Sequence, residues 1–199
     1  MTKLFNLHTH HPLPPDEETI RTCGIHPWRV TPNWQRKFNL CFGPLNFPFS
    51  SAPQLLHAIG ECGLDSLCDV PMELQEAAFR AQVGESELRC IPMIIHCVKQ
   101  TQLLLDIHRT ATQTWVWHGF RGKPQQMQQL LQHGFYISFG MHYNSDSLAV
   151  CPHDRLFLET DDIQTSIRPL YEQAAQLRST TLDALSQQVW DNAKRLFFK

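Results

Sequence analysis

The segment 55–65 places one carboxylate, Glu61, between two glycines directly after an apolar run. The apolar run is typical of a buried strand, and Gly60 and Gly63 are typical of the tight backbone that follows a strand. A buried carboxylate without a partner is costly and tends to take up a proton, so Glu61 needs an ion pair or a bound cation. Taken alone, the segment favours a structural salt bridge.

Four other strand-like runs also end in histidine or aspartate, and they favour a metal site instead. In the run 4–10, side chains alternate between faces, so Asn6, His8 and His10 point the same way. Two histidines two positions apart on a strand can bind one metal ion from the same side. The five polar strand ends are His10, Glu61, His96, His118 and Asp161.

Strand-like runs alternate with helical patterns along most of the chain. The strand-like runs are 4–10, 22–28, 55–61, 91–96, 115–118, 135–140 and 155–161, and the helical patterns are 71–90, 103–107, 125–133, 167–177 and 181–198. This alternation predicts a parallel sheet of the α/β class. Seven strands, with an eighth near 163–168, favour a TIM-like (β/α) barrel, shortened because about 250 residues is more usual. A flavodoxin-like open sheet is the alternative, although such a sheet would not ordinarily need seven strands.

In either architecture the functional side chains lie at the carboxyl ends of the strands, where all five polar ends fall. Four imidazoles and two carboxylates suit one or two divalent ions, Zn²⁺ or Mn²⁺, or Mg²⁺ if several waters remain. The expected metal ligands are His8, His10, Glu61, His96, His118 and Asp161.

Two metal ions bridged by one carboxylate form a hydrolytic site with a metal-activated water as nucleophile. Glu61 is the expected bridge because it lies between the two histidine pairs in the chain. Asp161 is the expected base, since a carboxylate at such a site can accept a proton from water. We therefore expect catalytic roles for Glu61 and Asp161.

Composition narrows the function classes. The 199 residues are enough for one domain with a full core, so we expect a single domain over 1–199. A net charge of −2 argues against a protein that coats nucleic acid, but not against an enzyme that holds one strand end. No apolar run approaches the roughly 20 residues of a membrane span, and no signal peptide is visible. Seven cysteines without a Cys-x-x-Cys motif indicate a reduced, cytoplasmic protein, and nothing indicates an obligate protein partner.

Several motifs, in the same order, resemble the TatD family of metal-dependent deoxyribonucleases. They are His8-Thr9-His10, Gly24-Ile25-His26-Pro27, Gly60-Glu61-Cys62-Gly63-Leu64-Asp65, Ile95-His96-Cys97, His118-Gly119-Phe120-Arg121-Gly122 and Glu159-Thr160-Asp161. Gln75 and Phe79 match the Gln-x-x-x-Phe pattern of the family. The resemblance covers nearly the whole chain, and the set of motifs is far more specific than any member of it.

The resemblance implies a TIM-like barrel with two metal ions. It implies that one ion is bound by His8, His10 and Asp161 and the other by His96 and His118, with Glu61 between the two. It further implies hydrolysis of phosphodiester bonds, with DNA or nucleotide ends as the substrate.

Three residues are candidates for contacts with that substrate. The resemblance implies that His26 lies near a phosphate. Where the family usually has His-x-Arg, this chain has Val98 in place of the arginine, and Lys99 is the nearest replacement. Arg121 follows a predicted ligand and is placed to meet a phosphate or to face solvent.

Other departures from the family pattern bear on activity. Asn6 stands where the family usually has aspartate, and the loss of that charge is expected to loosen or reorient a neighbouring ligand. Asp162-Ile163 replaces the usual Ser-Pro. The chain is short around 31–53, where interleaved prolines and phenylalanines predict a packed loop that covers the core.

Three function classes remain open from the sequence. A metal-dependent deoxyribonuclease is favoured. A metal-dependent hydrolase of a small amide, ester or phosphoester is the alternative, because fold and metals do not determine substrate. A metal-binding scaffold with little activity is the third, suggested by Asn6 and the missing length.

Overall fold

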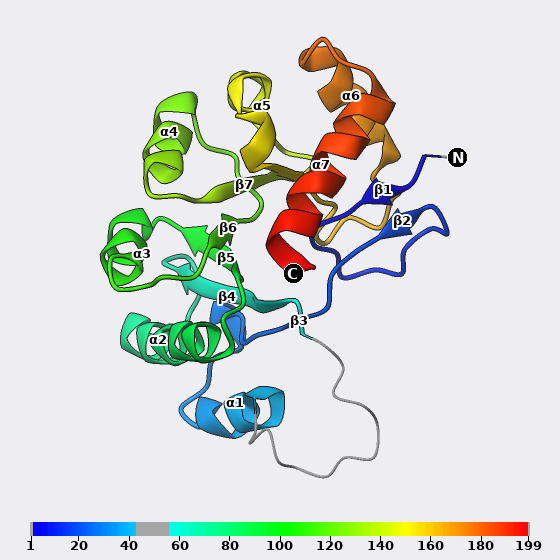
Figure 1. Ribbon diagram of the computed structural model, residues 1–199. Coiled ribbons are helices and arrows are strands. Elements are labelled where there is room, and N and C mark those ends of the chain that lie inside the picture. The colour runs from blue at the N-terminus through cyan, green and yellow to red at the C-terminus, as the bar shows by residue number, and fades with distance from the viewer. Residues whose placement is uncertain (1, 43–55, 199) are drawn as a thin grey trace. The chain divides into compact units, whose positions relative to one another are not determined.

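The computed structural model describes residues 2–42 and 56–198. Its contacts divide the chain into two compact units. The terminal unit comprises Met1–Ile20 and Thr114–Lys199, and the central unit comprises Arg21–Gln113. In both units parallel strands alternate with helices (Figure 1). The single domain expected over 1–199 stays a prediction.

The central unit is built on three parallel strands. In the order in which they pair, these are β3 (Thr22–Cys23), β4 (Ala58–Asp65) and β5 (Met93–Val98). Its helices are η1 (Pro27–Arg29), α1 (Trp34–Phe42), α2 (Met72–Arg89) and α3 (Thr101–His108). The helix α2 packs on β4 (Figure 1).

The helix α2 confirms the helical pattern at 71–90. Ala78, Phe79 and Val83 recur at helical spacing and are buried, so one apolar face drives the helix onto the sheet. The helix ends at Cys90, whose left-handed backbone (φ 55°) allows its N–H to reach carbonyls of the last turn. The glycine at 84 is exposed and does not interrupt the helix.

The terminal unit contains two parallel strand groups. One is β1 (Leu4–Phe5) with β2 (Glu17–Glu18), and the other pairs β6 (Trp115–Trp117), β7 (Tyr136–Phe139) and β8 (Leu156–Leu158) in that order. Its helices are α4 (Pro124–Gln132), α5 (Ser145–Val150), η2 (His153–Arg155), α6 (Arg168–Leu177) and α7 (Leu182–Phe197).

An aromatic cluster joins β1, β8 and α7 in the core of the terminal unit. The Phe5 ring centroid lies 5.8 Å from that of Phe157, 5.2 Å from that of Trp190 and 6.3 Å from that of Phe197. Phe5 and Phe157 are fully buried, and each such side chain contributes about 1.5–3 kcal/mol by leaving water. The cluster anchors α7 on the strand that leads to His8 (Figure 1).

Several sequence expectations about strands are corrected. The runs 4–10 and 155–161 form strands of only two and three residues. Beyond them the Leu7 N–H donates to the Leu158 carbonyl, and Thr9 and Asp161 form only an isolated bridge. The segment 163–168 holds no strand; the additional strand is β2, which pairs with β1. β2 consists of Glu17 and Glu18, and because glutamate is uncommon in strands, nothing local predicted it.

Two helices also differ from expectation. α1 lies within the stretch 31–53, where a packed loop was predicted, and the remainder of that stretch from 43 lies outside the described residues. α5 was not predicted, although Asn144 caps it by accepting a hydrogen bond from the Ser147 N–H.

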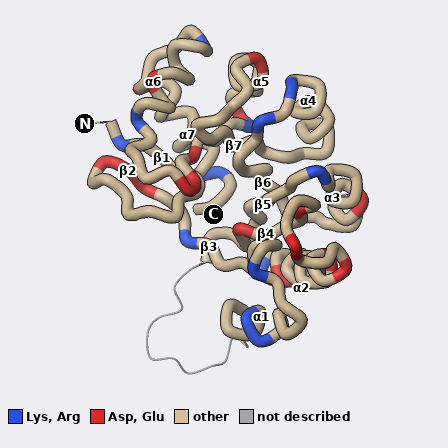
Figure 2. Tube along the Cα trace, turned by 180° about the vertical axis from the view of Figure 1, so that it is seen from behind, with Lys and Arg blue, Asp and Glu red and all other residues tan. Residues whose placement is uncertain are grey.

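Charges of both signs occur in each unit (Figure 2). In the central unit the basic positions Arg36 and Lys37 lie on α1, whereas α2 carries four glutamates. Among the described residues, no helix is long and apolar enough to cross a bilayer.

Candidate metal-binding groups

In the terminal unit three of the expected ligands converge. Nε2 of His8 lies 3.8 Å from Oδ1 of Asp161, and Nε2 of His10 lies 3.7 Å from the same oxygen. The two imidazole rings are nearly perpendicular, with centroids 4.8 Å apart. Two ring nitrogens and a carboxylate oxygen therefore face one small volume, as ligands of one ion do.

The backbone explains this convergence. Thr9 and Asp161 form an isolated parallel bridge, in which the Asp161 N–H donates to the His8 carbonyl (3.0 Å) and the His10 N–H donates to the Asp161 carbonyl (3.1 Å). Asp161 has φ 52°, a left-handed conformation that costs about 1 kcal/mol or more in a residue other than glycine. Strain of this kind concentrates at functional sites, and here it coincides with the carboxylate that both histidines face.

Asn6 takes part in the same scaffold. Its fully buried side chain donates from Nδ2 to Thr160 Oγ1 (2.9 Å) and accepts from the Thr160 N–H at Oδ1 (3.2 Å). The amide therefore provides a donor and an acceptor to the residue that precedes Asp161. These two bonds hold the neighbour of Asp161, and the loosening of a ligand expected from Asn6 stays a prediction.

His118 is oriented by a buried carboxylate that the sequence analysis did not single out. Nδ1 of His118 lies 3.1 Å from Oε1 of Glu159, which also accepts from the Gly119 N–H (2.6 Å). Burial by itself would raise the pKa of Glu159, but His118, His8 and the Ser138 hydroxyl together hold it below its ordinary value. The ionised carboxylate keeps the proton on Nδ1, so Nε2 carries the lone pair that a metal requires.

The His118 group adjoins the other ligands of the terminal unit. Its ring centroid lies 5.4 Å from that of His8. Ligand atoms of His118, Glu159 and Asp161 lie within 4.8 Å of one another. The terminal unit thus brings together four of the six expected ligands, with Glu159 behind them.

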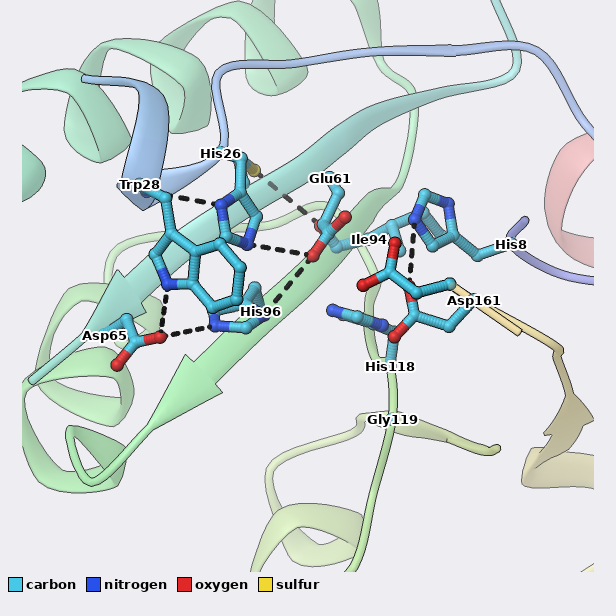
Figure 3. A network of polar contacts seen from close by, with 12 residues as sticks. His8, His26, Trp28, Glu61, Asp65, Ile94, His96, His118, Gly119 and Asp161 are labelled. Atoms are coloured by element: carbon cyan, nitrogen blue, oxygen red, sulfur yellow. Dashed lines mark hydrogen bonds and ion pairs between the residues drawn. The ribbon is translucent and has the colours of Figure 1, made fainter. Parts of the chain in front are cut away.

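In the central unit Glu61 is the meeting point. Its Oε1 lies 3.1 Å from Nε2 of His26 and 3.3 Å from Nδ1 of His96 (Figure 3). These three residues form the second group of possible metal ligands in the described chain. The remaining two expected ligands, Glu61 and His96, are therefore adjacent.

A β-bulge carries Glu61. Ile59 pairs with Met93 and Cys62 with Ile95, so Gly60 and Glu61 together stand opposite Ile94 alone. The strand was expected to end at the glycines, but β4 continues to Asp65. A bulge re-aims side chains beside active sites, and this one sets the direction of Glu61.

Two glycines of the motifs are required by close backbone approach. A Cβ on Gly63 (φ 149°) would lie 1.8 Å from the carbonyl oxygen of His96. A Cβ on Gly24 would lie 2.7–2.8 Å from the backbone of Gly60 and Glu61. These glycines therefore let the strands that deliver His26, Glu61 and His96 lie against one another.

Asp65 orients His96 from the other side. Its Oδ2 lies 3.1 Å from Nε2 of His96 and accepts from the Trp28 indole N–H at 2.6 Å (Figure 3). Burial would raise the pKa of Asp65, but hydrogen bonds from Trp28 and the Leu67 N–H, together with His96, lower it. An ionised Asp65 holds the proton on Nε2, which leaves the lone pair of Nδ1 toward Glu61.

Gln75 explains the Gln-x-x-x-Phe pattern. Its Oε1 accepts from the Asp65 N–H (2.8 Å), and its Nε2 donates to the carbonyls of Asp65 (2.9 Å) and Val70 (2.8 Å). Phe79, one turn later, is fully buried in the core. The helix therefore fixes the backbone of the residue that orients His96.

His26 is arranged as a hydrogen-bond donor. Its Nδ1 accepts from the Trp28 backbone N–H (3.2 Å), so in the neutral ring the proton lies on Nε2, which faces Glu61. A nitrogen that carries a proton cannot bind a metal. The Nε2–H of His26 points toward Oε1 of Glu61 in this arrangement, and the phosphate contact expected for His26 stays a prediction.

The other two expected substrate contacts are more peripheral. Lys99 is exposed directly after β5, with φ 56°. Arg121 lines a hollow of about 140 Å³ in the terminal unit, together with Asp161 and His142. Arg121 is therefore placed to contact a group that reaches Asp161.

Sequence reasoning missed Glu159, Asp65 and Trp28 as parts of the site. Two signals were present: Glu159 shares a strand face with Asp161, and Asp65 closes the motif that begins at Gly60. Nothing in the sequence indicated that the Trp28 indole bonds to Asp65.

The donor set fits divalent transition ions. His118 and His96 each present one nitrogen to a buried, ionised carboxylate and the other to the site, which is the arrangement of metal-bound histidines. Ring nitrogens and carboxylate oxygens suit Zn²⁺ and Mn²⁺. The His118–Glu159 contact in the terminal unit and the His96–Asp65 contact in the central unit are the reason that the donor set fits such ions.

Known proteins resemble this chain over most of its length. A "metal-dependent hydrolase YabD" of Bacillus subtilis, described as uncharacterized, is 28% identical over 74% of this chain and 67% of that protein. A "3'-5' ssDNA/RNA exonuclease TatD" of Enterobacter lignolyticus is 31% identical over 70% of this chain and 56% of that protein. The chain thus spans about two thirds or less of these relatives' length.

Solved structures support the fold. The TatD homologue YJJV of Escherichia coli matches with a TM-score of 0.73 and 21% identity, over 92% of this chain and 78% of the other. A TatD family hydrolase of Entamoeba histolytica matches with a TM-score of 0.74 and 19% identity, over 92% and 76%. These likenesses confirm the predicted α/β class with the TIM-barrel type of fold.

The model of one protein family matches residues 15–198, which is nearly the whole chain. That family is described as TatD related DNase. It is the family whose motifs the sequence resembles. The chain therefore belongs to the TatD related DNase family.

Proposed function

We propose that this protein is a divalent-metal-dependent hydrolase that cleaves phosphodiester bonds at the ends of single-stranded nucleic acid, DNA first among them. The observation that carries the proposal is the convergence of His8 Nε2 and His10 Nε2 on Oδ1 of Asp161. Names of relatives that act on single-stranded DNA and RNA support the substrate class.

The proposed ligands are the six residues expected from the sequence. His8, His10, His118 and Asp161 belong to the terminal unit, and Glu61 and His96 belong to the central unit. Divalent ions held there, Zn²⁺, Mn²⁺ or Mg²⁺, supply Lewis acidity and neutralise phosphate charge. The bridging role of Glu61 stays a prediction.

The chain's own groups have separate tasks in this proposal. Asp161, whose side chain is partly exposed, accepts the proton released as water attacks phosphorus. His26 donates its Nε2–H to a phosphate oxygen, and Arg121 pairs with a second one. Glu159 and Asp65 hold the imidazoles of His118 and His96 in the orientation that binding requires.

The overall charge agrees with an enzyme that holds one strand end. A net charge of −2 does not favour binding along many phosphates, so the proposed contact is confined to the site. Location in the cytoplasm and a single domain over 1–199 belong to the same proposal.

The test uses chelator-stripped protein and a single-stranded oligonucleotide labelled at one end, with Mg²⁺, Mn²⁺ or Zn²⁺ added in turn. A ladder that appears only with metal supports the proposal and shows at which end digestion begins. Asp161→Asn run in parallel excludes a contaminating nuclease, because the ladder should vanish with the variant.

Two outcomes would overturn the nuclease. Bound metal by elemental analysis without cleavage of DNA or RNA, but with turnover of a small ester, amide or phosphoester, would favour the small-substrate hydrolase. Bound metal without turnover on any of these would favour the scaffold.

A further inference from the structure

Trp28 is a large apolar side chain held in an exposed position beside the His26–Glu61–His96 group. It is 59% exposed, although the histidines that it contacts are largely covered. Exposed tryptophans in such surroundings are typical of binding surfaces, because the ring offers a large apolar face at small entropic cost.

The ring is fixed on two sides. Its indole N–H donates to Asp65 Oδ2 (2.6 Å), and its centroid lies 4.9 Å from that of His26 and 6.0 Å from that of His96, both at steep angles (Figure 3). Asp65 is itself held by Gln75. The orientation of the indole is therefore set before any ligand arrives.

A hollow opens beside the ring. It has a volume of about 360 Å³ and is lined by Trp28, Asp65, Leu67, Cys68, Asp69 and Val70. Leu67 is 66% exposed and adds a second apolar group. The volume lies at the lower end of the range for small-ligand pockets and is large enough for one planar ring.

We infer that Trp28 and this hollow form a subsite for the nucleobase of the nucleotide whose phosphate lies at His26, Glu61 and His96. The inference rests on the proposed function and deepens it, because it says how the strand end is held. An aromatic face stacks with any base, since every base has a π-face.

The charges at the hollow favour a base over a phosphate. The carboxylates of Asp65 and Asp69 line it, and they repel phosphate while accepting hydrogen bonds from the amino groups of bases. The strand therefore enters with its base in the hollow and its phosphate toward the histidines. Asp65 contacts both Trp28 and His96, so base and phosphate are positioned by one rigid assembly.

The test compares two single-stranded oligonucleotides that differ only in the terminal nucleotide, which is normal in one and abasic in the other. Both strand ends are prepared in this way, and removal of the terminal nucleotide is measured with the metal-loaded protein. For the wild-type protein, an abasic terminal nucleotide should raise KM about 5- to 150-fold relative to the normal nucleotide. This is the range measured for the loss of one base–aromatic stack.

Three variants make the result specific. Trp28→Ala should abolish the preference, so that the normal and the abasic end have similar KM values, whereas Trp28→Phe should retain most of the preference. Leu88→Ala removes another exposed apolar side chain of the central unit (72% exposed). It should leave KM unchanged for both the normal and the abasic oligonucleotide. An equal loss on both ends in Trp28→Ala would mean that Trp28 only supports Asp65, and would overturn the inference.

Binding separates this inference from the proposed function. Fluorescence anisotropy of the same labelled oligonucleotides reports their affinity for metal-loaded protein without any turnover. If nothing is cleaved but the normal end still binds more tightly through Trp28, the subsite stands and the nuclease falls. Equal affinity for the normal and the abasic oligonucleotide would reject the subsite, whether or not cleavage occurs.

Discussion

Oε1 of Glu159 lies 3.1 Å from Nδ1 of His118 and accepts the Gly119 N–H at 2.6 Å. The carboxylate is fully buried, so its charge is not screened by water. It therefore determines both the tautomer and the ring orientation of His118. Asp65 does the same for His96 through Nε2. In both units an expected ligand is held by a carboxylate behind it.

Glu159→Gln should weaken metal binding without unfolding the protein. The amide has the same shape and can still accept from Gly119, but it no longer makes the His118 nitrogen more basic. Loss of such a partner typically costs 10- to 100-fold in metal affinity. Calorimetric titration of Zn²⁺ into stripped protein measures it, with Glu172→Gln on the exposed face of α6 as the control. Wild-type affinity in Glu159→Gln would refute the role.

Asp161→Asn should retain the fold and lose turnover. Asparagine tolerates the left-handed conformation that Asp161 adopts at φ 52°, so the free energy of unfolding should change by less than about 1 kcal/mol. Without a proton acceptor the rate should fall about 10²- to 10⁴-fold. The matched control is Asp146→Asn, at an exposed position of α5, which should keep most activity. A wild-type rate in Asp161→Asn would eliminate it as base.

The sequence predicted the strong periodic elements and the polar strand ends. α2 was predicted within a residue at each end, and so were α4 and α6, because apolar spacing and caps determine such helices locally. His8, His10 and Asp161 were expected together, and the terminal unit places them together. Period and spacing are local signals, so one sequence suffices for them.

Features that depend on distant contacts were not predictable. β2 forms only because Glu17 and Glu18 meet β1, and nothing local favours a strand in two glutamates. The bulge at Glu61 requires Ile94 opposite it. The bond from Trp28 to Asp65 joins residues that are 37 positions apart. Such pairings arise from tertiary packing, which overrides local propensity.

Gly63→Ala should be severely destabilising, whereas Gly84→Ala should stabilise. The new Cβ at 63 would lie 1.8 Å from the His96 carbonyl oxygen, so β4 and β5 would have to separate, at a cost of about 3 kcal/mol or more. At 84, on the exposed side of α2, a Cβ meets nothing within 4 Å, and alanine should add about 0.5–1 kcal/mol. Thermal unfolding of both variants measures this. A similar change in both would contradict the steric argument.

Glu87 should make the stability of the central unit depend on pH. Burial would raise its pKa, but hydrogen bonds from the Thr112 hydroxyl and the Thr112 and Gln113 N–H groups lower it below 4.5. The folded protein therefore binds fewer protons than the unfolded chain in this range, so the stabilisation is complete above pH 4.5 and is lost as the pH falls through the lowered pKa.

Glu87→Gln should accordingly lower the melting temperature at pH 7 and lose this difference from wild type in acid. The loss follows because a protonated Glu87 and a glutamine are both neutral and accept these hydrogen bonds less strongly than the carboxylate does. Melting curves between pH 3 and pH 7 measure the difference, with Glu73→Gln as the control because it removes the same charge from an exposed position of α2. A difference that stays constant across this range would show that Glu87 stabilises the fold without its charge.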